Sequence, residues 1–82
     1  MDDGDWLRVE FGRLLKDLRE ERGLSQAQLA LDSGLDQTFV SLLERGRRQP
    51  SLISVFALCD ALDVEPDVLV RRLMAARPRK RR

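Results

Sequence analysis

Apolar residues recur at intervals of three and four near the start of the chain, which is the spacing of one face of an α-helix. The positions are Leu7, Phe11, Leu14, Leu15 and Leu18. Asp5 is a residue type that caps helices, and Gly23 can adopt the left-handed conformation that ends them. The pattern therefore predicts a first helix over residues 6–22.

Four more segments show apolar positions at helical spacing, and each is preceded or opened by a residue that commonly begins a helix. They cover residues 26–33 after Ser25, 37–45 after Asp36, 52–62 after Ser51, and 66–76 opened by Pro66. The 52–62 segment is expected to bury Leu52, Val55, Phe56, Leu58, Cys59 and Leu62. Because no segment alternates apolar and polar residues as strands do, the sequence predicts an all-α fold of five short helices.

A chain of 82 residues has the length of one domain. We expect an acidic, flexible segment over residues 1–5, a folded domain over 6–76 and a basic, flexible tail over 77–82. No run of about 18 apolar residues is present, so no membrane span is predicted. The acidic amino end is unlike a secretory signal, and one cysteine cannot form an internal disulfide. A reducing cytoplasm is the expected location.

Charge is unevenly distributed, although the formal net charge is only +1. Three aspartates lie within the first five residues, and five basic side chains lie within the last six. A second basic cluster consists of Arg45, Arg47 and Arg48. These clusters indicate contact with a polyanion, whereas the alternative is that the arginines are only solvated surface residues.

The stretch over residues 26–45 has the spacing of a helix-turn-helix, in which two short helices cross at close range. A small residue is needed at the crossing, a residue tolerant of positive φ in the turn, and apolar anchors on the second helix. Ala30, Gly34, Val40 and Leu43 stand at these positions, with Leu29 and Leu35 completing the small core. An amphipathic helical hairpin without a DNA function is the alternative interpretation.

The chain also resembles the lambda-repressor-like, or Xre-type, regulators from about Phe11 to Leu73. The resemblance is carried by Gly23-Leu24-Ser25-Gln26, Leu29-Ala30, Gly34-Leu35 and the segment from Glu44 to Ser51. Within that family, residues 35–41 and the Glu44-Arg45-Gly46 motif look most similar to controller proteins of restriction–modification systems. Such proteins often have Arg where this chain has Gln37 and Tyr where it has Phe39. The resemblance therefore implies the docking mode but not the operator sequence.

In that docking mode the helix over residues 37–45 enters the major groove, with its first residues at the base edges. Gln37, Thr38 and Ser41 are the predicted base contacts, since Val40 and Leu43 face inward. Glutamine can bond adenine through two hydrogen bonds, and threonine can contact a base or a thymine methyl group. The alternative for Gln37 and Thr38 is that they only favour the start of the helix.

Contacts to the phosphate backbone are predicted on both sides of that helix. The predicted residues are Ser25, Gln26, Phe39, Arg45, Arg47 and Arg48. Gln26 stands at a helix amino end, where N–H groups attract phosphate, although it could serve only as a capping residue. For Phe39 the alternative is partial packing against the domain. The resemblance further implies a structural ion pair between Glu44 and an arginine such as Arg19.

The last predicted helix is apolar over more than one face, which suggests a contact with a second copy of the chain. The resemblance places the dimer contact there as well. The predicted interface consists of Phe56, Val68, Leu69, Arg72 and Leu73. A homodimer would bind a palindromic double-stranded operator, while the alternative is that these residues only close the domain's own core.

Enzymatic function is not expected, because the chain has no histidine and only one cysteine. We predict no catalytic residue, no metal site, no cofactor and no small-molecule ligand, and interpret Cys59 as a core residue. RNA polymerase is a further expected partner of a regulator. A prophage-type repressor, an antitoxin-like regulator and a protein- or RNA-binding adaptor of the same fold remain alternatives, and both activation and repression are open.

Overall fold

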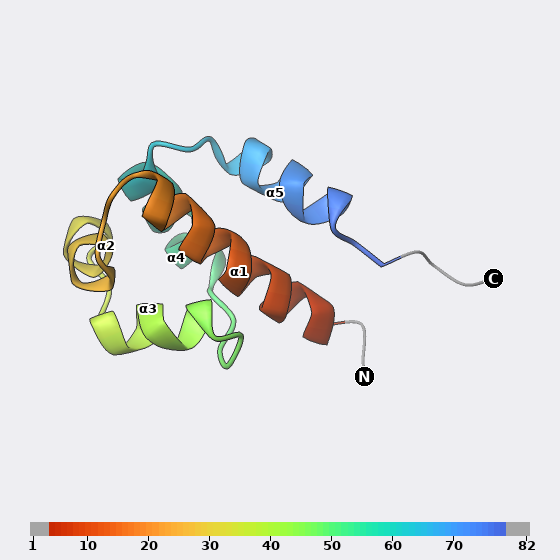
Figure 1. Ribbon diagram of the computed structural model, residues 1–82, viewed down its shortest axis with the longest axis horizontal. Coiled ribbons are helices and arrows are strands. Elements are labelled where there is room, and N and C mark those ends of the chain that lie inside the picture. The colour runs from red at the N-terminus through yellow and green to blue at the C-terminus, as the bar shows by residue number, and fades with distance from the viewer. Residues whose placement is uncertain (1–3, 79–82) are drawn as a thin grey trace.

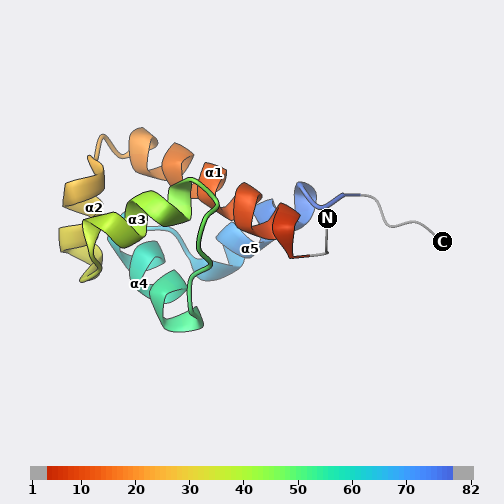
Figure 2. The same ribbon diagram turned by 90° about the horizontal axis from the view of Figure 1, so that it is seen from below.

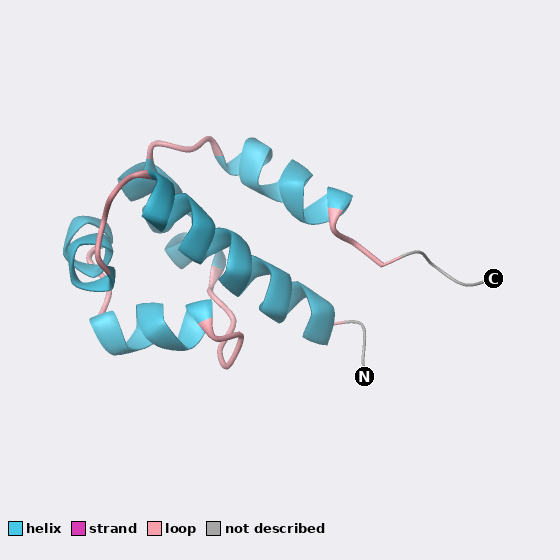
Figure 3. Ribbon diagram, in the orientation of Figure 1, coloured by secondary structure: helices cyan, strands magenta, loops and turns pink. Residues whose placement is uncertain are grey.

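The computed structural model describes residues 4–78, which form five helices joined by short turns (Figure 1). The helices are α1 (Asp5–Glu21), α2 (Gln26–Ser33), α3 (Gln37–Glu44), α4 (Leu52–Leu62) and α5 (Pro66–Ala75). Residues 4–78 contain no strand, so the predicted all-α class is confirmed (Figure 3). Residues 1–3 and most of the predicted basic tail, 79–82, lie outside the described residues.

Serine side chains begin α2 and α4 as predicted. Ser25 Oγ accepts a hydrogen bond from the Gln28 N–H at 3.0 Å, and the Gln28 side chain accepts one from the Ser25 N–H at 2.9 Å. Ser51 Oγ likewise accepts a hydrogen bond from the Ser54 N–H at 3.0 Å. These bonds satisfy N–H groups that have no partner within a helix.

Of the two aspartates predicted to cap helices, Asp5 is not an N-cap, and Asp36 is the N-cap of α3 without a capping side-chain bond. Gly4 is the N-cap of α1, whereas Asp5 belongs to the first helical turn and forms an ion pair with Arg8. A carboxylate in the first turn is favoured by the helix dipole even without capping. Asp36 does occupy the N-cap position of α3, but its side chain makes no capping hydrogen bond.

The helices are arranged around α1, which runs through the middle of the molecule. In Figure 1, α3 lies on one side of α1 and α5 on the other, and the view from below in Figure 2 places α3 in front. Contacts join α1 to α3 and α5, α2 to α3 and α4, and α4 to α5. One consequence is that α3 and α5 present separate surfaces of the same small domain.

The core between these helices is made mostly of leucines. Its buried side chains are Phe11, Leu15, Leu18, Leu29, Ala30, Val40, Leu43, Leu58, Cys59, Leu62, Leu69 and Leu73. Every helix therefore contributes to one core. Cys59 is fully buried, as predicted, and this burial raises the pKa of its thiol above the usual value.

The prediction for α4 was wrong at its amino end. Leu52 is 73% exposed and Phe56 is 50% exposed, although both were expected to be buried. Most residues of α4 are apolar, so spacing alone could not distinguish the face that packs on the core. None of the helices in the described part of the chain has the length and hydrophobicity needed to cross a membrane.

Candidate nucleic-acid interface

The helix-turn-helix predicted over residues 26–45 is formed by α2 and α3. Val40 and Leu43 are fully buried on the inner face of α3, and Ala30 is 5% exposed on α2. Gly34 ends α2 with φ 74°, and the Leu35 N–H donates to the Ala30 carbonyl at 2.9 Å. Each of the predicted positions thus performs its expected structural role.

Inward packing of Val40 leaves the first turn of α3 at the surface. Gln37 and Thr38 are exposed, and Ser41, one turn later, is half-buried. Within residues 4–78, the side chains of Gln37 and Thr38 form no hydrogen bond. Three uncharged polar side chains are therefore grouped on the outer side of α3.

The basic cluster follows directly after α3. Arg45, Arg47 and Arg48 are exposed, and no ion pair to a carboxylate engages any of them within the described residues. The Arg48 guanidinium lies 5.9 Å from the centre of the Phe39 ring, near the outer limit for a cation–π contact. Phe39 itself is half-buried and packs against the core. The cluster places unneutralised positive charge at the carboxyl end of α3, with Arg48 reaching back toward Phe39 of the first turn.

A buried ion pair holds the carboxyl end of α3, just before the arginine cluster. Glu44 Oε2 accepts a hydrogen bond from Arg19 Nε at 2.7 Å, and Oε1 accepts one from the same guanidinium at 3.1 Å. The two side chains are only 3% and 11% exposed, respectively. Hydrogen bonding to Glu44 raises the pKa of Arg19, so the guanidinium stays charged. The predicted pairing of Glu44 with Arg19 is therefore present, and it ties α3 to α1.

The two residues predicted at the amino end of α2 are both engaged within the protein. Ser25 belongs to the capping box that begins this helix, and the Gln26 amide nitrogen donates to Glu44 Oε1 at 2.9 Å. Ser25 therefore caps α2 as predicted, whereas the alternative that Gln26 serves only as a capping residue does not describe its side chain. Gln26 instead bonds a carboxylate from another helix, a contact that the sequence did not indicate.

Sequence reasoning also gave no role to Gly12, which lies where α1 crosses the end of α3. A Cβ atom at this position would lie 2.3 Å from the Leu43 carbonyl oxygen and 2.7 Å from that of Glu44. Only glycine allows the two backbones to approach this closely. The available signal was an isolated glycine inside a helical pattern, which often marks a close packing contact.

The predicted dimer residues divide into two groups. Leu69 and Leu73 are only 1% and 9% exposed, so their side chains belong to the core of the single chain. The single chain thus agrees with the alternative for these two residues, in which they close the domain's own core, because the inner face of α5 packs on α1 and α4. Phe56, Val68 and Arg72 are exposed. Two side chains not predicted for the interface, Leu52 and Ile53, are more exposed still.

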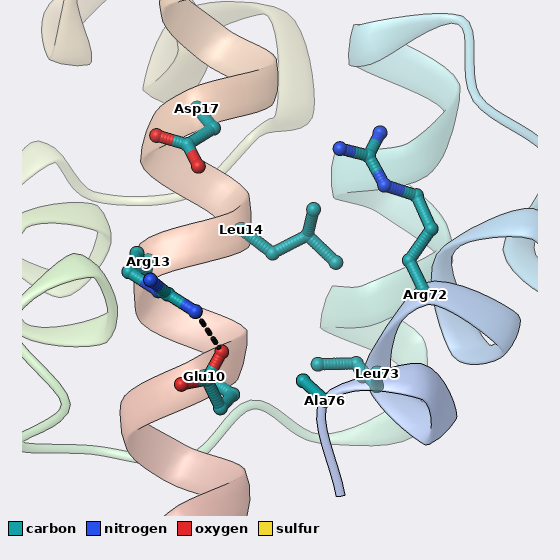
Figure 4. A pocket seen from close by; sticks show the side chains of 7 residues that line it. All are labelled: Glu10, Arg13, Leu14, Asp17, Arg72, Leu73 and Ala76. Carbon is teal, nitrogen blue, oxygen red and sulfur yellow. Dashed lines mark hydrogen bonds and ion pairs between the residues drawn. The ribbon is translucent and has the colours of Figure 1, made fainter.

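A small groove lies between α1 and α5, on the side of α1 away from α3 (Figure 4). It is lined by Glu10, Arg13, Leu14, Asp17, Arg72, Leu73 and Ala76. Arg13 and Glu10 form an ion pair at 2.6 Å within it. Among residues 4–78, no group of three or more potential metal-ligating side chains gathers in this groove or elsewhere.

Comparison with known proteins agrees with this geometry. The sequence model of a helix-turn-helix family matches residues 15–69. An HTH-type transcriptional regulator of Sinorhizobium fredii, y4dJ, is 45% identical over 64 residues, which cover 78% of this chain and 83% of that protein.

Two solved structures are similar in both fold and sequence. The restriction-modification controller protein C.AhdI from Aeromonas hydrophila has a TM-score of 0.73 and 49% identity, covering 74% of this chain and 92% of that chain. A mutant of the controller protein C.Esp1396I, bound to its highest affinity operator site, has a TM-score of 0.79 and 31% identity, covering 85% and 92%.

Proposed function

This chain belongs to the helix-turn-helix family of Xre-type transcriptional regulators, close to restriction–modification controller proteins, and we propose that it binds a palindromic operator as a homodimer. The observation that most supports the proposal is the exposed polar first turn of α3 together with exposed arginines, without ion pairs in the described residues, that follow the end of the same helix. Polar side chains on a rigid helix can read base edges, while flanking cations bind phosphate. A helix with the same exposed polar turn but without flanking arginines would lack the phosphate contacts.

In the proposed complex α3 lies in the major groove. Gln37 and Thr38 contact base edges there, and Ser41 does so one turn later. The arginines after α3 and the amino end of α2 contact phosphates on opposite sides of the groove, with Phe39 at its edge. Each well-formed bidentate base contact contributes about 1–3 kcal/mol of discrimination. Gln37 is therefore the residue with the largest expected effect on sequence preference.

Dimerisation is proposed through the apolar side chains that the monomer leaves exposed. Leu52, Ile53 and Phe56 lie within the first two turns of α4 and are 73%, 83% and 50% exposed. Val68 and Arg72 extend the proposed surface onto α5. Contiguous exposed apolar side chains favour association, since covering them removes apolar area from water. Two such modules would read half-sites spaced about 34–36 Å apart.

The biological role that we propose is control of a restriction–modification operon. The support is the similarity to C.AhdI and C.Esp1396I, which are controller proteins of such systems. A protein in this role would act in the cytoplasm, with RNA polymerase as its further partner. Whether it activates or represses would depend on where its operator lies relative to the promoter.

The test is selection of bound duplexes from a random pool with the full chain, followed by sequencing. We expect a two-fold symmetric consensus that loses information at particular positions in Gln37→Ala and Thr38→Ala. Arg13→Ala is the matched control, because this exposed residue lies beside α5 and should leave the consensus unchanged. A pool without a consensus would instead support an adaptor that binds nucleic acid without sequence preference.

A further inference from the structure

Glu44 is the meeting point of three helices. Its carboxylate, at the end of α3, accepts hydrogen bonds from Arg19 of α1 and from the Gln26 side chain of α2. The same Arg19 donates to the Leu24 carbonyl at 2.8 Å, which fixes the loop between α1 and α2. The first turn of α2 is thus attached to the last turn of α3 through one buried carboxylate.

The chemistry of this contact fixes the orientation of the Gln26 amide. An ionised carboxylate can only accept hydrogen bonds, so the amide atom 2.9 Å from Glu44 Oε1 must be the nitrogen. One of the two N–H bonds of that nitrogen is directed at Glu44. The other N–H bond of Gln26 forms no hydrogen bond within residues 4–78. It can therefore donate to an acceptor outside the domain. A phosphate oxygen is such an acceptor.

A carboxylate this close to a phosphate would normally weaken DNA binding. Here the bidentate contact with Arg19 balances its charge, so Glu44 can orient Gln26 without presenting a net negative charge to DNA. Gln26 is half-buried, which leaves part of its side chain at the surface. The three residues therefore combine a neutral, rigid support with one outward donor.

We propose that Glu44 is a positioning residue for DNA binding: it fixes the orientation of the Gln26 amide before DNA arrives, so that the second N–H can donate to a backbone phosphate. This inference rests on the proposed function, since it assumes that α2 begins beside the DNA backbone. Preorganisation of this kind reduces the entropy lost when a side chain becomes fixed on binding. The bond between Gln26 and Glu44 also fixes the distance between the amino end of α2 and the carboxyl end of α3, the two parts proposed to contact phosphates.

The test is a double-mutant cycle in affinity for the selected duplex, using Gln26→Ala and Glu44→Asp. The aspartate keeps the negative charge for Arg19 but withdraws the carboxylate from Gln26. We expect Gln26→Ala to weaken binding about tenfold, the size of one hydrogen bond to a charged group. Glu44→Asp should weaken it severalfold alone and have no further effect once Gln26 is alanine. The slope of affinity against salt should stay unchanged, because no charge is removed.

Thr38→Ala provides the matched control for general structural damage. Its effect should multiply with that of Glu44→Asp, because Thr38 is not bonded to Glu44. Independent effects of Gln26→Ala and Glu44→Asp would overturn the proposal. If the wild-type chain selects no consensus at all, the proposed function fails instead, so the two failures are distinguishable.

A measurement on the wild-type chain covers the case in which Glu44→Asp does not fold. The two side-chain amide protons of Gln26 are followed by nuclear magnetic resonance in the free protein and in the complex with the duplex. We expect one proton to be protected from exchange already in the free protein and the other only in the complex. Two protons that exchange rapidly in the free protein would contradict the proposal.

Discussion

At the scale of single residues, the contact between α1 and α3 depends on two unlike features that lie close together. Gly12 allows the helix backbones to approach, and the Arg19–Glu44 pair holds them at that distance. An ion pair with this geometry requires close approach, because both partners are almost fully withdrawn from water. Removing one buried partner would leave the other charge unpaired, which is more costly than losing an exposed pair.

Replacement of Gly12 by alanine tests this contact. Alanine favours helix over glycine by about 1 kcal/mol, so an open helical site would be stabilised. Here we expect destabilisation by about 1–3 kcal/mol, because the new methyl group overlaps backbone oxygens that cannot rotate away. Urea unfolding followed by circular dichroism measures the change. Ala27→Gly, at an exposed site of α2, calibrates helix propensity alone, and a Gly12→Ala chain more stable than wild type would contradict the packing argument.

The arginines after α3 allow a second test at this scale. Arg47→Ala should weaken binding to specific and random duplexes alike, because phosphate contacts carry no sequence information. Removing one such phosphate contact should reduce the slope of log affinity against log salt by about 1. Fluorescence anisotropy at several salt concentrations gives the slope. The control Arg13→Ala removes the same charge beside α5, and an equal change in its slope would show that only net charge matters.

At the scale of elements, the helix limits could be predicted because the signals that set them are local. Ser25 and Ser51 bond to N–H groups three residues ahead, and Gly34 needs only its own φ angle. The burial of α4 and α5 could not be predicted in the same way, since both are apolar on more than one face. Nor could the bond from Gln26 to Glu44, which joins residues 18 positions apart. Such contacts depend on how helices pack and leave no periodic pattern.

The turn between α2 and α3 is the element whose geometry is easiest to perturb in isolation. A Cβ atom at Gly34 would meet nothing within 4 Å, so Gly34→Ala introduces strain in φ without a steric clash. We expect it to destabilise the domain by about 1–2 kcal/mol, the cost of the left-handed conformation for an L-residue. Gly34→Asn should lose less, because asparagine tolerates that conformation. Thermal melts of both variants give the comparison, and equal losses would argue against a backbone origin.

At the scale of the whole molecule, the arrangement of helices restricts how two copies can bind one duplex. α3 and α5 lie on opposite sides of α1, so a contact made only through α5 would be remote from the DNA (Figure 1). The exposed apolar side chains of α4 follow the arginine cluster directly in the chain. A dimer surface centred there would place the two-fold axis closer to the recognition helices. For that reason α4, rather than α5 alone, is assigned the centre of the proposed dimer surface.

Ile53→Ser tests this assignment, with Leu31→Ser as its matched control. Both side chains are more than four-fifths exposed, at 83% and 82%, so neither replacement should destabilise the monomer. Only Ile53 belongs to the proposed surface, and losing its burial should weaken dimerisation about tenfold or more. Sedimentation at several protein concentrations measures the dissociation constant. Equal weakening by Leu31→Ser would show that the interface is not specific to α4. A wild-type chain that is monomeric at micromolar concentration would exclude a preformed dimer, and the two copies would then pair only on the operator.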